Sequence, residues 1–526
     1  GNGAAGIGGG AGDTDAVGGD GDVTISGGTI NATGGNLAAG IGGGAYGNGT
    51  VTITDGDITA KATGDYGAGI GGGFGAIPKD TLIGGNGTVT ISGGTITEAS
   101  GGYMAAGIGS GYQGLGKVTI EGDAVIKNAQ GGEAGAGIGS GSDGDSEIII
   151  RDNAVIENAE SKTGGAGIGS GQGFYYYEDD DGLLVIDRTV GNVTIEGNAK
   201  IENAKSGYGG SGIGGGAIGI GNVIIRGNAQ IGNAIGGEEG SGIGGGALGT
   251  GDVTIEGNVT IENAQGGAGA AGIGGGAETE PDTEDTRNKV SIKSTEAGSP
   301  NITATGGGVL NNEEAPLPGA AAIGSGSVAD GATEVKSDIT IEGKVTIDAT
   351  GGGDVAIGDS TNGETQFSGL QVGTTITRRN AKGDDVSQPG DVVREQAPTE
   401  TEAAEAPSTG SVEVERPVTV EGLYVTNVLG KQITHTCTQN GTTLTIRANG
   451  IVASAHLTLG MVRTLKAQGV KTLVFTTLLS RSTTVSVDAL LAAEPDAPDE
   501  TAVVWTHTGP RAALTIDGAD HSDLLK

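Results

Sequence analysis

The sequence of 526 residues is short of several residue types, and each shortage excludes a class of protein. It has one cysteine, Cys437, so no disulfide can form within the chain; we expect a small buried residue of the C-terminal region. Aromatic residues make up only 3% of the chain, which argues against a large globular core in the N-terminal region. All four histidines lie beyond residue 410, so the first 400 residues have none for catalysis.

Long apolar runs and positive charge are also scarce. No run reaches the ~18 residues of a transmembrane helix, so membrane insertion is not expected. The net charge of −36 argues against nucleic acid as a partner and fits an extracellular or bacterial cell-surface location. The chain begins inside a repeat with neither a signal peptide nor an initiator Met, which predicts a processed or truncated fragment.

Glycine is abundant, at 112 residues, and much of it lies in one recurring phrase. Gly-Ile-Gly-Gly-Gly, with Ser sometimes in the fourth place, recurs most often at a spacing of 30 residues. A fixed period of this length predicts a solenoid. The copies begin at Gly6, Gly40, Gly69, Gly107, Gly137, Gly167, Gly212, Gly242 and Gly272, and degenerate copies follow around Ile323 and Ile357.

Each repeat contains three short strand-like segments, as residues 253–255, 259–261 and 270–274 illustrate. In Val-Thr-Ile the apolar side chains alternate with Thr, so a strand three residues long can bury its apolar face only against copies of itself. The pattern predicts an all-β, right-handed parallel β-helix with three short strands per ~30-residue coil. About 11 coils would form a rod of roughly 50 Å.

Composition divides the chain into three parts. We expect the parallel β-helix to occupy residues 1–377 and an acidic linker rich in Pro, Thr and Glu to occupy residues 378–410. From residue 411 the glycine content falls and alternating runs appear, such as residues 443–446 and 473–475. Residues 411–526 are therefore predicted to form a small β-rich or α+β domain, with a helix at residues 461–467.

The third strand of each coil raises the first functional question. If its Ile points inward, its glycines leave a bare outer face, and Gly in a strand often marks the close approach of another backbone or a ligand. One interpretation is a docking stripe for a second chain or a flat polymer. The other is that glycine satisfies a tight corner with positive φ. The stripe would comprise Gly40, Gly42, Gly69, Gly71, Gly107, Gly109, Gly137, Gly139, Gly242 and Gly244.

The few aromatic residues of the repeats gather on both sides of this strand in sequence. Such rings at the borders of a shallow strip suit stacking on sugar rings or burial in a protein interface. They could instead simply cover corners. The candidate ligand-binding residues are Tyr46, Tyr66, Phe74, Tyr103, Tyr112, Phe174, Tyr175, Tyr176, Tyr177 and Tyr208.

The sequence also contains two recurrent or clustered polar features. Asn recurs after the second strand at positions 128, 158, 203, 233 and 263, and we interpret it as a structural ladder that satisfies backbone groups. Asp179, Asp180 and Asp181 form an oxygen-rich run that could take Ca²⁺. Neither this run nor any other acidic stretch matches an EF-hand or a repeated calcium motif, so no cofactor is expected otherwise.

Gly-Ala-Gly-Ile-Gly-Gly-Gly joined to Val-Thr-Ile-x-Gly-Gly-Thr-Ile, in residues 67–73 and 89–96, resembles repeats of large cell-surface β-helix proteins of gut-type Gram-positive bacteria. The resemblance covers about residues 1–360 and implies an adhesin-like or carbohydrate-binding role, without binding residues to carry over. We expect a non-catalytic adhesin or stalk that binds a glycan, or a host or bacterial surface, along the Gly-rich face. The alternatives are self-assembly through that bare face, as a dimer or filament, and a polysaccharide lyase or hydrolase.

Overall fold

The computed structural model divides into two units, Gly1–Pro398 and Thr399–Lys526. It describes all residues except 1–2, 12–17, 77–82, 178–183, 278–286, 310–317, 329–335, 360–365, 389–390, 394–415, 419, 421, 428–430, 434, 441, 449–451, 478–481, 496, 509–510 and 526.

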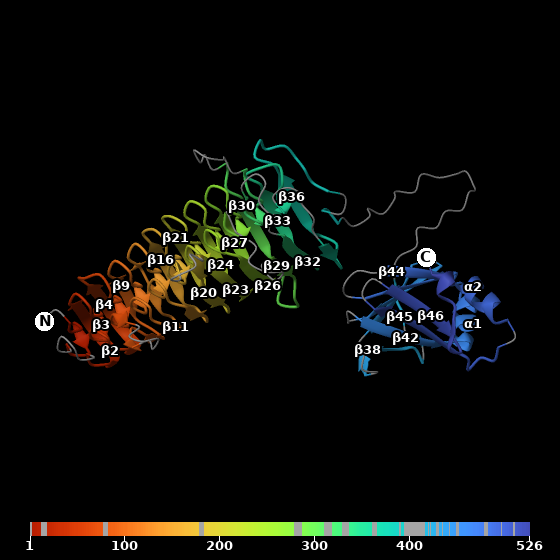
Figure 1. Ribbon diagram of the computed structural model, residues 1–526, viewed down its shortest axis with the longest axis horizontal. Coiled ribbons are helices and arrows are strands. Elements are labelled where there is room, and N and C mark those ends of the chain that lie inside the picture. The colour runs from red at the N-terminus through yellow and green to blue at the C-terminus, as the bar shows by residue number, and fades with distance from the viewer. Residues whose placement is uncertain are drawn as a thin grey trace, which may run out of the picture. The chain divides into compact units, whose positions relative to one another are not determined.

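The first unit is a parallel β-helix whose coils each contribute to three faces (Figure 1). The glycine face contains the Gly-Ile-Gly segments, and its eleven described strands pair in parallel with Ile beside Ile. We count the coils by these strands. They are β1 (Ile7–Gly8), β3 (Ile41–Gly42), β5 (Ile70–Gly71), β10 (Ile108–Gly109), β14 (Ile138–Gly139), β17 (Ile168–Gly169), β22 (Ile213–Gly214), β25 (Ile243–Gly244), β28 (Ile273–Gly274), β31 (Ile323–Gly324) and β34 (Ile357–Gly358).

The other two faces are the valine face, with the Val-Thr-Ile segments, and the asparagine face, with the Ile-x-Asn-Ala segments. In the first coils β2 (Gly21–Gly34) and β4 (Gly49–Ala62) run through the corner between them. The valine face continues with β8 (Gly87–Ile91), β11 (Gly116–Ile120), β15 (Ser146–Ile150), β20 (Thr189–Ile195), β23 (Gly219–Gly227), β26 (Gly251–Gly257), β29 (Asn288–Lys293), β32 (Ser337–Glu342) and β35 (Gln366–Ser368).

The asparagine face continues in the same order along the chain. Its strands are β9 (Thr95–Ser100), β12 (Val125–Ile126), β13 (Ala129–Gln130), β16 (Val155–Ser161), β21 (Lys200–Ser206), β24 (Gln230–Ile235), β27 (Thr260–Gln265), β30 (Asn301–Thr305), β33 (Thr346–Thr350) and β36 (Thr375–Arg379). Two hairpins lie outside the three faces: β6 (Gly75–Ala76) with β7 (Ile83–Gly84), and β18 (Phe174–Tyr177) with β19 (Leu184–Asp187).

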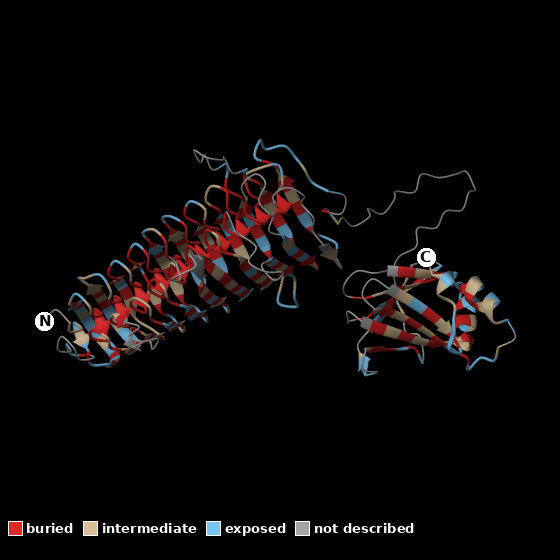
Figure 2. Cartoon of the chain, in the orientation of Figure 1, coloured by how far each residue is buried: buried red, intermediate tan, exposed pale blue. Residues whose placement is uncertain are grey.

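The apolar side chains of all three faces meet in one continuous core along the first unit (Figure 2). Val118 and Ile120 are buried while Thr119 between them is partly exposed, as period-two alternation requires. Each buried Ile contributes about 1.5–3 kcal/mol, which exceeds the roughly 0.5–1 kcal/mol that a neighbouring Gly costs in a strand. The prediction of an all-β parallel β-helix with three strands per coil and about 11 coils is confirmed.

Each Gly-Ile-Gly triplet is a narrow loop rather than a flat strand segment. The residues on either side of it are bonded to each other: Ala39 N–H donates to the Gly43 carbonyl at 2.9 Å. Ile41 is fully buried at the inner tip, and Gly42 has φ +130°, a value that side chains disfavour. A β-carbon on Gly42 would lie 2.0 Å from the Gly71 carbonyl oxygen of the next coil. Glycine is therefore required both for the loop and for the stacking of coils.

This geometry contradicts the prediction of a bare outer face. All ten glycines of the predicted stripe are buried, because each triplet is closed on itself and its neighbours in the stack belong to the same chain. The close approach that the glycines permit is thus between successive coils. The glycines that the sequence predicted to be exposed, and that are buried, are Gly40, Gly42, Gly69, Gly71, Gly107, Gly109, Gly137, Gly139, Gly242 and Gly244.

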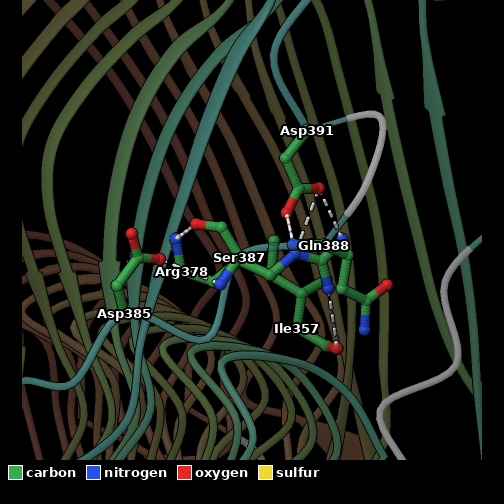
Figure 3. Close-up of polar contacts among 6 residues, drawn as sticks. All are labelled: Ile357, Arg378, Asp385, Ser387, Gln388 and Asp391. Atoms are coloured by element: carbon green, nitrogen blue, oxygen red, sulfur yellow. Dashed lines mark hydrogen bonds and ion pairs between the residues drawn. The ribbon is translucent and has the colours of Figure 1, made fainter.

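The core ends at a buried ion pair (Figure 3). Arg378 stands in register with the core residue Ala349, and its guanidinium bonds Asp391 through Nε and Nη2, each with a contact of 3.0 Å. The side chains of Arg378 and Asp391 are only 2% and 1% exposed. Nη1 also donates to the Ile357 carbonyl at 3.4 Å, and the guanidinium lies 5.3 Å from the centre of the Phe367 ring.

The segment that supplies Asp391 folds back along the last strand and caps the core. Antiparallel bridges join Thr375 to Val392 and Arg379 to Asp385, so β36 is flanked by residues 384–388 and 391–393 where another coil would stack. The first unit therefore extends past residue 377, where the sequence prediction ended it, and the described residues 378–393 of the predicted linker belong to the rod. The rest of that linker, residues 394–410, lies outside the described residues.

The described residues of the second unit form two sheets and two short helices, in keeping with a β-rich domain. Helix α1 (Leu459–Ala467) begins at Thr458, whose side chain caps Met461 N–H, and Gly469 at φ +90° follows its end. Helix α2 (Val487–Ala493) and a 3-10 turn, η2 (Ser522–Leu524), complete the helical elements of the described chain.

Strands of the second unit surround a separate core that contains Trp505 and Cys437. One sheet contains β37 (Arg416–Pro417), β40 (His435–Asn440), β41 (Thr443–Ala448), β43 (Thr472–Thr476) and β44 (Ser482–Ser486). The other contains β39 (Gln432–Ile433), β38 (Tyr424–Asn427), β42 (Val452–Thr458), β45 (Ala502–Thr508), β46 (Arg511–Ile516) and β47 (Ala519–Asp520).

Replacing a glycine inside one triplet tests the stacking. In Gly244→Ala the new β-carbon would lie 2.1 Å from the Gly274 carbonyl oxygen at a backbone φ of +131°. We expect unfolding monitored by circular dichroism to show a loss of at least about 2–3 kcal/mol. Gly308→Ala is the matched control, because a β-carbon there meets nothing within 4 Å. Equal stability losses in the two variants would contradict this account.

Removing one partner tests the cap. Asp391→Ala leaves Arg378 buried without its counter-charge, which should cost about 3–5 kcal/mol locally. We expect faster hydrogen exchange of the β36 amides and earlier proteolysis near residue 391. The control is the double variant Arg378→Met/Asp391→Leu, which removes both charges and should retain slow exchange. If both variants open the cap alike, the ion pair is not what holds it.

Candidate functional site

Four aromatic side chains from three successive coils form one cluster, which we call the aromatic ridge: Tyr46, Tyr66, Phe74 and Tyr112. The Phe74 ring lies at its centre, 5.0 Å from Tyr46, 4.7 Å from Tyr66 and 5.8 Å from Tyr112, measured between ring centres. Tyr66 and Tyr112 are 5.7 Å apart. The Phe74 and Tyr112 rings are nearly parallel, at 6°, whereas the other pairs are tilted or edge-on.

Backbone hydrogen bonds between successive coils hold the ridge in place. The loop before one glycine-face strand bonds the loop after the next: Phe74 N–H donates to the Leu37 carbonyl at 2.8 Å, and Tyr112 N–H to the Tyr66 carbonyl at 3.1 Å. The ridge therefore lies on loops that flank β3, β5 and β10. In later coils the same loop bond is made by small residues such as Ala217 and Ala247.

The four rings are half-buried, so each is partly open to solvent. Contacting aromatic pairs contribute about 0.5–1.5 kcal/mol beyond the burial of their area, which favours one fixed arrangement over independent rings. Tyr46 has φ +60° and is followed by Gly47, so its ring projects from a left-handed turn. A rigid scaffold thus presents an aromatic surface that the rest of the repeat does not have.

A polar pair adjoins one end of the ridge. Gln113 follows Tyr112, and its Nε2 donates to Asp143 Oδ2 of the next coil at 2.8 Å. Burial raises the pKa of the Tyr112 hydroxyl, and the charge of Asp143 and the neighbouring Tyr66 raise it further. Burial also raises the pKa of Asp143, with Asp187 and Asp145 adding to the shift, while the Gln113 bond opposes it.

Among the described side chains, Tyr103, Phe174 and Tyr208 do not join the ridge. Tyr103 and Tyr208 are 47% and 50% exposed, on loops before β10 and β22. Residues Phe174–Tyr177 form strand β18, which pairs with β19 as an antiparallel hairpin and therefore leaves the glycine face; among the described side chains, Phe174 is half-buried. Four of the ten predicted residues are brought together: Tyr46, Tyr66, Phe74 and Tyr112.

Sequence reasoning missed Gln113 and Asp143. The sequence did contain a partial signal, because Gly47, Gly114 and Gly144 each lie seven residues after the first Gly of a triplet (Gly40, Gly107 and Gly137), and the structure gives the residue before each of them a φ near +60°. Tyr46, Gln113 and Asp143 are thus equivalent positions, and side chains there project from the same turn in coils two, four and five. Recognising that equivalence would have grouped a polar pair with the rings.

The polar columns elsewhere on the rod are structural. Each Asn of the predicted ladder donates to the preceding one at 3.1–3.3 Å, from Asn263 back to Asn128. Along the valine face, Arg151 Nε and Arg226 Nε each bond a Glu of the preceding coil at 2.8 Å. These cations are exposed and paired within the repeat, as expected for a solvated column.

Within the described residues no group of three or more His, Cys, Asp or Glu side chains could hold a metal ion. The predicted Ca²⁺ candidates Asp179, Asp180 and Asp181 lie outside the described residues. In the part of the chain that the structure describes, no helix is long and apolar enough to cross a bilayer.

Comparison with known proteins supports the fold class. A family model described as Beta helix repeat matches residues 23–45, 51–74 and 89–112, which are the coils that carry most of the ridge. Together with the parallel stacking, this defines the first unit as a parallel β-helix. Neither the curated proteins nor the solved structures give a match.

The coupling of Asp143 to the ridge can be measured. Because the pKa of Tyr112 is raised in the folded state, the chain should lose stability as pH rises above ~10, where only the unfolded chain forms that phenolate. Asp143→Asn should shift the Tyr112 titration to lower pH. The measurement is tyrosinate absorbance, with Tyr112→Phe as the difference reference and Asp252→Asn as a remote charge control. An unshifted Tyr112 titration in Asp143→Asn would contradict the coupling.

Proposed function

We propose that this chain is a non-catalytic, extracellular β-solenoid of the adhesin or stalk type, and that it binds a glycan through the aromatic ridge. The observation that carries the proposal is the cluster of four rings in coils two to four. At the position of Phe74 and Tyr112, later coils have Ala217 and Ala247, so the clustered rings depart from the repeat, and departures of this kind are expected at functional sites.

The chemistry of the ridge suits a sugar better than a protein anchor. Half-buried rings fixed against one another offer flat, rigid apolar surface at little cost in side-chain entropy. The Tyr hydroxyls and the Gln113–Asp143 pair add donors and acceptors beside that surface, which sugar hydroxyls can use. Apolar ring faces with hydrogen-bonding groups at the edge are complementary to the two sides of a pyranose.

The contact surface differs from the one that the sequence predicted. The glycine face is closed within the rod, so it offers no bare sheet for a ligand or for a second rod. The proposed binding surface is therefore limited to the ridge on the outer loops. The other coils and the cap support that surface, which fits a stalk that holds a small binding patch on a rigid body.

A glycan array with a ridge variant tests the proposal. We expect the full chain to bind at least one host or dietary glycan, and Tyr46→Ala/Phe74→Ala/Tyr112→Ala to weaken that binding by at least tenfold. Tyr46→Ala alone, which retains the other three ring contacts, should weaken it several-fold. Affinities are measured by isothermal titration, after circular dichroism shows that each variant is folded.

The matched control is Tyr208→Ala, which removes an exposed Tyr from an equivalent loop away from the ridge. It should leave affinity within about twofold. Glycan binding that is unchanged in the triple variant would exclude the ridge as the site. The absence of binding to every glycan on the array would contradict the proposed function as a whole.

A further inference from the structure

The electrostatic setting of the ridge points to a class of glycan, and this inference rests on the proposed function. Among the described residues of the loops that carry and adjoin the ridge there are acidic side chains but no Lys or Arg; Lys79 and Asp80, beyond Phe74, lie outside the described residues. The acidic residues of these loops are Asp65, Glu133, Asp143 and Asp145, within residues 35–39, 44–48, 63–68, 73–75, 101–106, 111–115, 131–136 and 141–145. A ligand on the ridge therefore meets negative charge from the described residues of these loops.

Asp143 is the acidic residue most closely tied to the rings. It bonds Gln113, the neighbour of Tyr112, and Tyr112 is stacked on Phe74. Its charge also reaches the Tyr112 hydroxyl, whose pKa it raises, and Asp143 itself is half-buried. A charge held in this position is screened less by salt than one on a freely exposed side chain.

The surrounding charges reinforce that of Asp143. Asp145 and Asp187 act on it electrostatically, and both are exposed. Arg188 is next to Asp187 in sequence, but its guanidinium bonds the Leu248 carbonyl, in a coil three strands beyond that of Asp143 on the glycine face. More broadly, residues 1–150 contain 15 Asp and Glu residues against four Lys.

We propose that the aromatic ridge selects uncharged glycans over uronate-containing or otherwise anionic ones, and that Asp143 is the residue that sets this selectivity. An anionic sugar on the ridge would place its carboxylate beside Asp143, where the described residues of these loops supply no cation to pair with either group. Such like-charge juxtaposition acts as a repulsive element, and repulsive elements often decide specificity more than attraction does. A neutral sugar loses nothing, because the Gln113–Asp143 pair can still bond its hydroxyls.

The test uses matched sugars that differ only in charge. Neutral gluco- and galacto-oligosaccharides are titrated against the full chain beside the same oligosaccharides oxidised at C6 to uronates. We expect the neutral form to bind at least tenfold more tightly at low ionic strength, with the difference shrinking in concentrated salt. In Asp143→Asn, the ratio of uronate affinity to neutral affinity should rise several-fold, because the substitution removes the repulsion that only the uronate meets, whereas any hydroxyl contact of residue 143 is changed for both sugars alike.

Asp252→Asn is the control, since it removes one charge from an exposed position on the valine face in a remote coil. Uronates that bind the wild-type chain as tightly as the neutral sugars would overturn the selectivity while leaving the proposed function intact. Equal effects of Asp143→Asn and Asp252→Asn would assign the effect to net charge and overturn the role of Asp143. If neither sugar form binds at all, the proposed function fails and this inference fails with it.

Discussion

The structure depends on the contact of one backbone with an identical backbone in the next coil. At the glycine face a carbonyl oxygen of each coil occupies the space where a β-carbon of the neighbouring coil would be, as Gly42 and Gly71 illustrate. Only glycine permits that approach, and only a strict register repeats it between all ten successive pairs of the eleven described strands. The columns of Ile, Asn and paired charges follow from this register, because equivalent residues are then always neighbours.

Much of the rod could be predicted from the sequence because its rules are local and repeated. The alternation of Val, Thr and Ile identifies the buried side of a strand, and the 30-residue spacing identifies stacking. What the period did not reveal was the shape of the Gly-Ile-Gly segment, since the bond from Ala39 to Gly43 gives no sequence signal of its own. The sequence Gly-Ile-Gly is compatible with both a flat strand and a closed loop, but only the flat strand would leave the glycines exposed.

The cap at the end of the rod and the residues of the ridge were harder to predict from the sequence, because each occurs only once and is not part of the repeat. Arg378 lies two residues after Ile376 in a polar segment. No pattern near it in the sequence predicts that Asp391 folds back to pair with it. The gathering of aromatics on either side of the glycine segment was visible in the sequence, and four of them do meet. The contribution of Asp143 required knowledge of which turn lies above which, and therefore of the stacking itself.

The position of the cap has a mechanical consequence. Residues 391–393 are the last described residues of the first unit, so tension applied from the C-terminal side reaches them before any coil. The load would peel Val392 and Val393 away from β36, where a few hydrogen bonds break one after another, and would then meet the paired charges of Arg378 and Asp391. The parallel hydrogen bonds between the preceding coils would be loaded only after the Arg378–Asp391 ion pair had broken.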